Sequence, residues 1–336
     1  MVFMMVMSAL QRQILGRKGL PPIGEADQYV AHENASTSES LYSLKRHPVD
    51  VSPLHWDAFF DKKDILEIED DSFCVYSKGD SGPVFYLLHG GGYSGLTWAC
   101  FADSLSKEID CRILAPDLRG HGETECKDET DLSVERQVND VINIHKTFFK
   151  NENVPTVLVG HSMGGALAVH AAALNQLHTA AALCVIDVVE GSAMEALSRM
   201  RPFLSSRPQD FSSVEAAIHW CLQTKTAKNV KAARISMPSQ IREKYVWRID
   251  LAKTEGHWLG WFKGLSKLFL SCSVPKILVL AGVDRLDTEL TVGQMQGKFQ
   301  NTILPKVGHA VQEDSPEKLA DVLAKFVIRF RICGHK

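Results

Sequence analysis

The chain has 336 residues, of which 45% are hydrophobic and 23% charged, and its formal net charge is −3. This balance excludes a strongly basic nucleic-acid-binding protein and a disordered polyampholyte, because the charge is close to zero and the apolar content is high. The apolar start, residues 1–7, is far shorter than the roughly 20 residues that a membrane-spanning helix needs.

The N-terminal extension, residues 1–53, mixes proline, glycine, serine and charged residues without periodicity, so we expect irregular structure there. Its apolar start follows no basic residues and precedes no clear cleavage site, so we expect no signal peptide. The eight cysteines form no C-x-x-C pair, and several lie inside apolar runs. Reduced thiols and a cytoplasmic or nuclear location are therefore expected.

From residue 64 onward, apolar runs typical of strands alternate with segments typical of helices. A short strand pair is predicted at residues 65–68 and 72–76. Further strands are predicted at residues 83–88, 111–116, 156–159, 182–186, 276–280 and 301–304. Helices are predicted at residues 132–149, 166–173 and 316–331. This alternation predicts an α/β fold with a mostly parallel sheet and helices on both faces.

Residues 189–274 interrupt the alternation and contain four of the six tryptophans. They are predicted to form a helical lid inserted into a core made of residues 54–188 and 275–336. Open parallel sheets bind their ligands at the carboxyl ends of the strands. Polar residues follow the predicted strands at these ends: His89, Asp117, Ser162, Asp187, Asp284 and His309.

The central motif is Gly160-x-Ser162-x-Gly164, which follows a predicted buried strand and opens a predicted helix. A serine held on such a sharp strand-to-helix turn is the arrangement of a nucleophile elbow, and the glycines leave room for it. A serine hydroxyl needs a base to remove its proton. Among the thirteen histidines, His309 is the one placed after the last strand and before the closing helix, so it is the expected base.

The base needs an acid to orient it, and two aspartates fit the chain order serine, acid, histidine. Asp187 ends the strand after the nucleophile's strand, and Asp284 ends the next one. The residues alone leave this choice open. The oxyanion formed during acyl transfer needs backbone N–H donors, and we expect these from Met163 and Gly91, with Gly92 as the next choice after Gly91.

The glycine run at residues 90–92 lacks the Lys-Ser/Thr of a phosphate-binding loop and the G-x-G-x-x-G spacing, so no nucleotide cofactor is expected. The predicted chemistry requires no metal and no other cofactor. Tryptophans and a phenylalanine of the lid are candidates for an apolar slot that receives the substrate: Trp247, Trp258, Trp261 and Phe262. Arg248 or Arg119 is a candidate for contacting the substrate's backbone or carboxylate.

Several longer strings resemble the protein phosphatase methylesterase family of the α/β-hydrolase superfamily, over about residues 64–332. The strings are Leu87-Leu-His-Gly-Gly-Gly-Tyr-Ser94, Asp117-Leu-Arg-Gly-His-Gly-Glu-Thr124, Gly160-His-Ser-Met-Gly-Gly165, Ile186-Asp-Val-Val-Glu-Gly191, Val246-Trp-Arg248, Leu251-Ala-Lys-Thr-Glu255, Ala281-Gly-Val-Asp-Arg-Leu-Asp287 and Gly293-Gln-Met-Gln-Gly-Lys-Phe-Gln300. The fourth and the last are far more specific than the serine motif.

The resemblance implies a serine esterase that removes the methyl ester from the C-terminal leucine of the type 2A protein phosphatase catalytic subunit. It implies that this subunit is the partner, with no nucleic acid and no membrane involved. It also implies that the acid is Asp187, since the family's acid lies in the Ile-Asp-Val-Val-Glu string. Two alternatives remain: a general carboxylesterase acting on small esters, and a non-catalytic inhibitor that binds the phosphatase.

Overall fold

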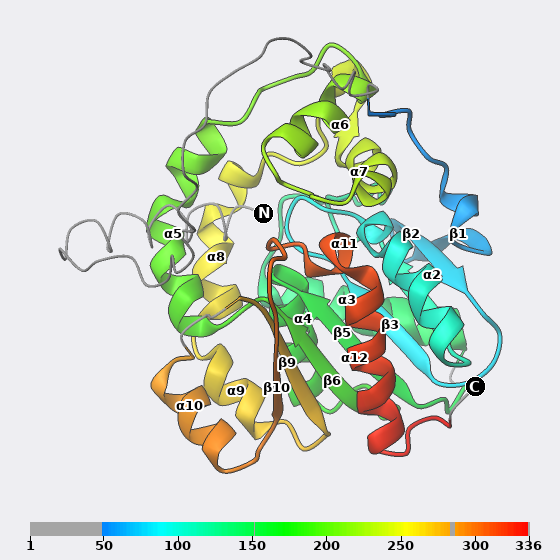
Figure 1. The fold of residues 1–336 in the computed structure, drawn as a ribbon, viewed down its shortest axis with the longest axis vertical. Coiled ribbons are helices and arrows are strands. Elements are labelled where there is room, and N and C mark those ends of the chain that lie inside the picture. Colours follow the sequence, from blue (N-terminus) through cyan, green and yellow to red (C-terminus); the bar gives the residue numbers. More distant parts are fainter. Residues whose placement is uncertain (1–48, 151, 283–285, 335–336) are drawn as a thin grey trace, which may run out of the picture.

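The computed structural model describes residues 49–150, 152–282 and 286–334. The prediction for residues 1–48 and the alternative acid Asp284 therefore lie outside the described residues. Within these ranges, eight strands form one sheet in the order β1-β2-β4-β3-β5-β6-β9-β10 (Figure 1). β2 pairs antiparallel with both β1 and β4, and the other neighbours are parallel. The mostly parallel sheet is thus confirmed.

Each predicted strand is present, with ends that differ from the prediction by at most three residues. The strands are β1 (Lys62–Ile68), β2 (Asp71–Lys78), β3 (Val84–Leu88), β4 (Arg112–Pro116), β5 (Thr156–His161), β6 (Ala180–Ile186), β9 (Lys276–Ala281) and β10 (Gln300–Leu304). Every residue of β3, β5 and β9 is buried. Strands covered on both faces read as continuous apolar runs, which is why the sequence reveals them.

Helices cover both faces of the sheet. The predicted helices are α3 (Val134–Phe149), α4 (Met163–Ala173) and α12 (Pro316–Arg329); the chain also forms α2 (Ala99–Glu108), α10 (Thr288–Met295) and α11 (Val311–Asp314). Tyr86 and Leu88 of β3 pack with α3 and α4, whereas Phe85 and Leu87 pack with α2 and α12. α2 and α12 lie in front of the sheet in Figure 1. Adjacent strand residues therefore point to opposite faces and build two cores.

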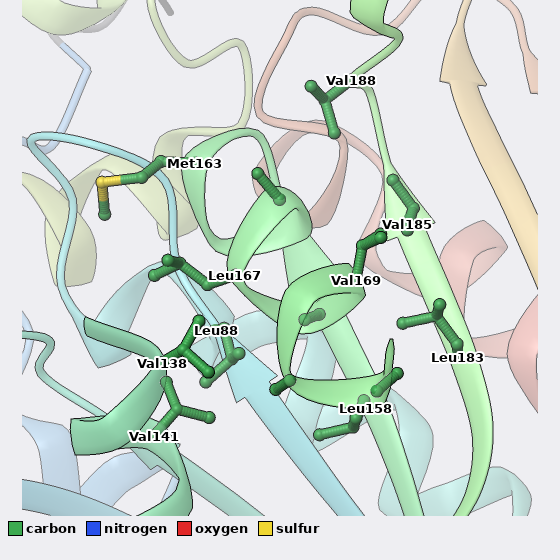
Figure 2. Close-up of a cluster of buried hydrophobic side chains, with 14 of the residues drawn as sticks. Leu88, Val138, Val141, Leu158, Met163, Leu167, Val169, Leu183, Val185 and Val188 are labelled. Atoms are coloured by element: carbon green, nitrogen blue, oxygen red, sulfur yellow. The ribbon is translucent and has the colours of Figure 1, made fainter. Parts of the chain in front are cut away.

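Figure 2 shows the core around α4, where side chains of α4 lie between those of α3 and those of β5 and β6. The labelled residues are Leu88, Val138, Val141, Leu158, Met163, Leu167, Val169, Leu183, Val185 and Val188. Each of these side chains is buried. This packing fixes the N-terminus of α4, and with it the turn that joins β5 to α4.

The chain between β6 and β9 is mostly helical, as expected for residues 189–274. It contains α5 (Glu190–Ser205), α6 (Val214–Gln223), α7 (Val230–Ser236), α8 (Glu255–Phe262), α9 (Leu265–Ser271) and a hairpin of β7 (Ile241–Arg242) and β8 (Val246–Trp247). Short 3-10 helices also lie in this part of the chain: η3 (Met237–Gln240), η4 (Glu243–Tyr245) and η5 (Leu251–Thr254). Others lie earlier, η1 (Trp56–Ala58) before β1 and η2 (Gly95–Trp98) before α2. We call residues 189–274 the inserted segment. Its role as a lid stays an interpretation.

Most of the cysteines are buried in the core, and no disulfide is formed within the described residues. Across the same ranges, no helix combines the length and the apolar character needed to cross a membrane.

Candidate active site

Ser162 occupies a sharp turn between β5 and α4. Its φ of 53° and ψ of −118° are rare for a residue with a side chain, and such strain is typical of functional turns. Its backbone N–H donates a hydrogen bond to the Ile186 carbonyl at 3.0 Å. A Cβ on Gly160 would lie 2.1 Å from the Gly164 carbonyl oxygen, and one on Gly164 would lie 2.3 Å from the Leu88 carbonyl oxygen. Both glycines are therefore required by the close approach of the backbone.

His309 and Asp187 form a buried pair. Asp187 directly follows β6, and His309 lies on the loop between β10 and α11. The Nδ1 of His309 lies 2.6 Å from the Oδ2 of Asp187. The other carboxylate oxygen accepts a hydrogen bond from the Ala281 N–H at 2.8 Å. The carboxylate is therefore held from two sides, and it fixes which nitrogen of the imidazole carries the proton.

Burial sets the protonation of this pair. It holds the pKa of His309 well below its usual value, because the charged imidazolium would lose its hydration. Burial also raises the pKa of Asp187 to about 7, against the hydrogen bond from Ala281, which lowers it. The imidazole is thus neutral at neutral pH and can accept a proton.

A second histidine, His161, positions the loop that carries His309. The Nε2 of His161 lies 2.9 Å from the His309 carbonyl oxygen, and its Nδ1 lies 3.3 Å from the Gln312 side-chain nitrogen. Since a carbonyl only accepts, we assign the Nε2 of His161 as the donor, with Gln312 donating to Nδ1. Sequence reasoning did not identify this contact, which joins residues far apart in the chain.

Ser162 and His309 line one cavity of about 50 Å³. Its lining combines two predicted oxyanion residues, three predicted aromatic residues of the inserted segment and three residues that the sequence did not indicate. The lining residues are Gly91, Tyr93, Ser162, Met163, Met200, Leu251, Trp258, Trp261, Phe262 and His309. Its walls are mostly apolar and include a few polar side chains, as in a ligand site.

The two candidate oxyanion donors lie in the right elements. Met163 is the first residue of α4, so its N–H points out of a helix N-terminus, where negative charge is stabilised. Gly91 lies on the loop after β3. The neighbouring Gly92 uses its N–H within the loop, donating to the Nε2 of His121 at 2.9 Å. This contact favours Gly91 over Gly92 as the second donor.

The Asp117-Leu-Arg-Gly-His-Gly122 motif supports the loop after β3 through hydrogen bonds, and its residues do not line the cavity. The carboxylate of Asp117 accepts N–H groups from Gly95 at 2.6 Å and Glu123 at 2.8 Å. His89, which was also expected at the strand ends, accepts the Leu118 N–H at 2.9 Å. Asp117 and His89 therefore organise the loops and do not line the cavity.

Three predictions about the substrate-contacting residues need correction. Arg119 is buried and pairs with Asp71 at 2.5 Å and Asp140 at 2.7 Å. Arg248 pairs with Glu129 at 2.5 Å and donates to two backbone carbonyls. Neither arginine lines the cavity, because nearby acids and carbonyls engage both. Trp247 lines a neighbouring groove instead of the cavity.

Ser162 and His309 bring a hydroxyl and an imidazole to one cavity, and these are the groups that a nucleophile and its base require. Such a pair is suited to attack on an ester carbonyl, whose oxyanion needs N–H donors.

The chain is similar to known hydrolases in sequence and in fold. The model of a family described as "Alpha/beta hydrolase family" matches residues 85–322. The chain is 61% identical over 292 residues to "Probable protein phosphatase methylesterase 1" of Caenorhabditis elegans, covering 85% of this chain and 80% of that protein. It is 44% identical over 332 residues to "Protein phosphatase methylesterase 1" of Mus musculus, covering 84% and 86%. The solved structure of E-2-(acetamidomethylene)succinate hydrolase is similar in fold, with a TM-score of 0.67 at 22% identity over 79% of this chain and 98% of that one.

Proposed function

Because this chain belongs to the protein phosphatase methylesterase family of the α/β hydrolases, we propose that it is a carboxylic ester hydrolase that demethylates a protein phosphatase. Its proposed substrate is the methyl ester on the C-terminal leucine of the type 2A protein phosphatase catalytic subunit. One observation carries the proposal: Ser162, on its strained turn, lines the same cavity as His309, whose imidazole is paired with Asp187.

In the first step, the Oγ of Ser162 attacks the ester carbonyl while the Nε2 of His309 takes the hydroxyl proton. The carbonyl oxygen becomes an oxyanion, which accepts hydrogen bonds from the N–H groups of Met163 and Gly91. Asp187 stabilises the imidazolium that forms. His309 then gives its proton to the departing methoxide, so methanol leaves and leucine stays attached to Ser162 as an acyl-enzyme.

In the second step, water attacks the acyl-enzyme and His309 takes its proton. The bond to Ser162 breaks, the proton returns to the serine oxygen, and the leucine carboxylate is released. The same base and the same oxyanion donors serve both steps. The aromatic wall formed by Trp258, Trp261 and Phe262 supplies apolar surface for the leucine side chain, which fits an inserted segment acting as a lid.

The first test measures methanol release from fully methylated phosphatase by the wild type and by Ser162→Ala. We expect wild-type turnover and at least a thousandfold loss in the variant, since the remaining oxyanion donors and binding give only modest acceleration. Equal release by both proteins would remove Ser162 from the mechanism. A wild type that leaves the phosphatase methylated but cleaves p-nitrophenyl acetate would be a general esterase.

A binding measurement on the same variant separates catalysis from inhibition. If unmethylated phosphatase binds Ser162→Ala as tightly as wild type and neither protein releases methanol, the chain acts as a non-catalytic inhibitor. Thermal unfolding of the variant is the control for its fold, because Ser162 lies on a strained turn.

A further inference from the structure

A groove of about 480 Å³ lies beside the catalytic cavity in the inserted segment. Its walls include Arg207 and Pro208, which follow α5, together with Arg242 and Trp247 of the β7–β8 hairpin. Leu251 lines both the groove and the catalytic cavity, so the two lie next to each other. The groove therefore offers a path to a chain whose end occupies the cavity.

Arg207 is held in the groove without a hydrogen-bond acceptor for one of its nitrogens. Its guanidinium stacks on the Trp247 ring, with the central carbon 3.4 Å from the ring centroid. The indole of Trp247 is itself fixed by a 2.7 Å hydrogen bond to the Pro208 carbonyl. The Nε of Arg207 is buried, and no partner for it lies among the described residues. A buried donor left in this way is costly unless a ligand satisfies it.

The charge on Arg207 is also poorly compensated. Burial lowers the pKa of Arg207 to about 10, so the side chain stays positive at neutral pH. The nearby acid is Asp250, which also lines the groove. Its carboxylate accepts a hydrogen bond from the Ala252 N–H at 3.1 Å and lies 3.9 Å from the Nζ of Lys253. Within the described residues no ion pair joins Asp250 to Arg207. Arg242 also lines the groove, so its lining carries two arginines against one aspartate.

A second unsatisfied donor lies on the cavity side. The hydroxyl of Tyr93 is buried, and the described part of the chain offers it no hydrogen-bond partner. Tyr93 lines the catalytic cavity together with Leu251. The positive charge of Arg207 is close enough to oppose the effect of burial, which raises the pKa of Tyr93. Two buried donors, one on a residue of the cavity and one on a residue of the groove, thus lack partners among the described residues, and acceptors of a bound chain can satisfy both.

We propose that this groove binds the peptide that precedes the esterified residue, and that Arg207 there pairs with an anionic side chain of that peptide. The proposal rests on the proposed function and adds a specificity determinant to it. The Tyr93 hydroxyl donates to a peptide carbonyl in the cavity that Tyr93 lines. The methyl ester itself carries no charge, so the anion that Arg207 recognises must belong to an acidic or phosphorylated side chain upstream of the ester.

The test uses synthetic peptides that end in leucine methyl ester and differ at one of the four positions before it. Each position carries glutamate, phosphoserine or neutral glutamine in turn, and kcat/KM is measured from methanol release at low salt. We expect the best-placed anion to raise kcat/KM of the wild type about tenfold over glutamine, mainly through KM. A larger gain with phosphoserine than with glutamate identifies a phosphorylated side chain as the preferred anion; either gain supports the proposal.

The variant Arg207→Gln should reduce this anion-to-neutral ratio to about one, whereas Arg207→Lys should keep part of it. The matched control is Arg201→Gln, which removes the same charge from α5 at an exposed ion pair with Glu255 outside the groove, and should keep the full ratio. Persistence of the ratio in Arg207→Gln, or its absence in the wild type, overturns the proposal. Failure of the wild type to cleave any peptide ester would instead overturn the proposed function.

Discussion

At the residue scale, the acid of the proposed triad shows where sequence reasoning stops. Asp187 and Asp284 both follow strands predicted from the sequence and both precede His309, so position along the chain does not separate them. The family resemblance favoured Asp187, and the structure places its carboxylate 2.6 Å from His309. A contact between residues 122 positions apart depends on the register of the sheet, which single residues do not reveal.

We expect Asp187→Asn to lower kcat of the esterase by about a thousandfold or more. The amide would offer an N–H or a neutral oxygen in place of the carboxylate, so the imidazole would lose its orientation and its stabilising charge. The measurement is kcat for methanol release at pH 8. Asp284→Asn is the comparison, and a deeper loss in that variant would transfer the role to Asp284.

Glu313 is a buried acid close to the loop that carries His309, and the proposed mechanism does not use it. It lies in α11, accepts a hydrogen bond from the Thr97 hydroxyl at 2.6 Å, and is fully buried. Burial raises the pKa of Glu313 to about 7, from 4.5 for an exposed glutamate. Between pH 4.5 and about 7, Glu313 therefore stays protonated in the folded state but loses its proton in the unfolded state. The free energy of unfolding consequently falls as pH rises through this range.

We expect Glu313→Gln to gain stability relative to the wild type as pH rises from 5 to 8, by about 2 to 3 kcal/mol. The amide keeps a hydrogen-bond acceptor for Thr97 and has no proton to lose. Urea unfolding at pH 5 and at pH 8 gives the difference. The same difference at both pH values would show that Glu313 does not titrate in this window.

At the element scale, the turn from β5 into α4 depends on contacts between backbones. Gly160, Gly164 and Gly165 let the first turn of α4 lie against β5 and the end of β3. The sequence indicated the turn because the glycine spacing around Ser162 is distinctive. It did not indicate α2, which the structure places on the opposite face of the sheet.

Gly164→Ala should destabilise the fold by about 3 kcal/mol or more, because its Cβ would lie within 2.5 Å of the carbonyl oxygens of Leu88 and His89. The control is Gly260→Ala in α8, where a Cβ meets nothing within 4 Å. There alanine should stabilise by about 0.5 to 1 kcal/mol through its higher helix propensity. Thermal and urea unfolding give both values, and equal effects of the two variants would contradict the packing argument.

At the scale of the whole molecule, a buried ion-pair cluster ties distant segments together. Arg119, on the loop after β4, pairs with Asp71 at the start of β2 and with Asp140 in the middle of α3. Arg136 of α3 adds a second cation beside Asp71 at 2.6 Å. The same loop carries His121, which accepts the Gly92 N–H beside the candidate oxyanion donor. The cluster therefore supports the edge of the sheet on which the site is built.

Arg119→Met should lower the free energy of unfolding by about 3 to 5 kcal/mol. It leaves the carboxylates of Asp71 and Asp140 buried, with the partly exposed Arg136 as the remaining cation beside them. The matched control is Lys127→Met, which breaks an exposed pair with Asp70 and should change stability little. Urea unfolding at pH 7 compares the two. A wild-type stability for Arg119→Met would mean that the carboxylates are satisfied without it.

The sequence alone determined the α/β class, the strands, the serine turn and the histidine loop. These features are local: apolar runs mark strands buried on both faces, and a Gly-x-Ser-x-Gly spacing between a strand and a helix marks a sharp turn. The roles of Ser162, Asp187 and His309 stay predictions, which the measurements above test. Only the tertiary structure decided which side chains surround the serine, that Arg119 and Arg248 pair with acids, and that Arg207 lies in a groove beside the cavity. Those outcomes depend on packing between segments far apart in the chain, and no local pattern encodes them.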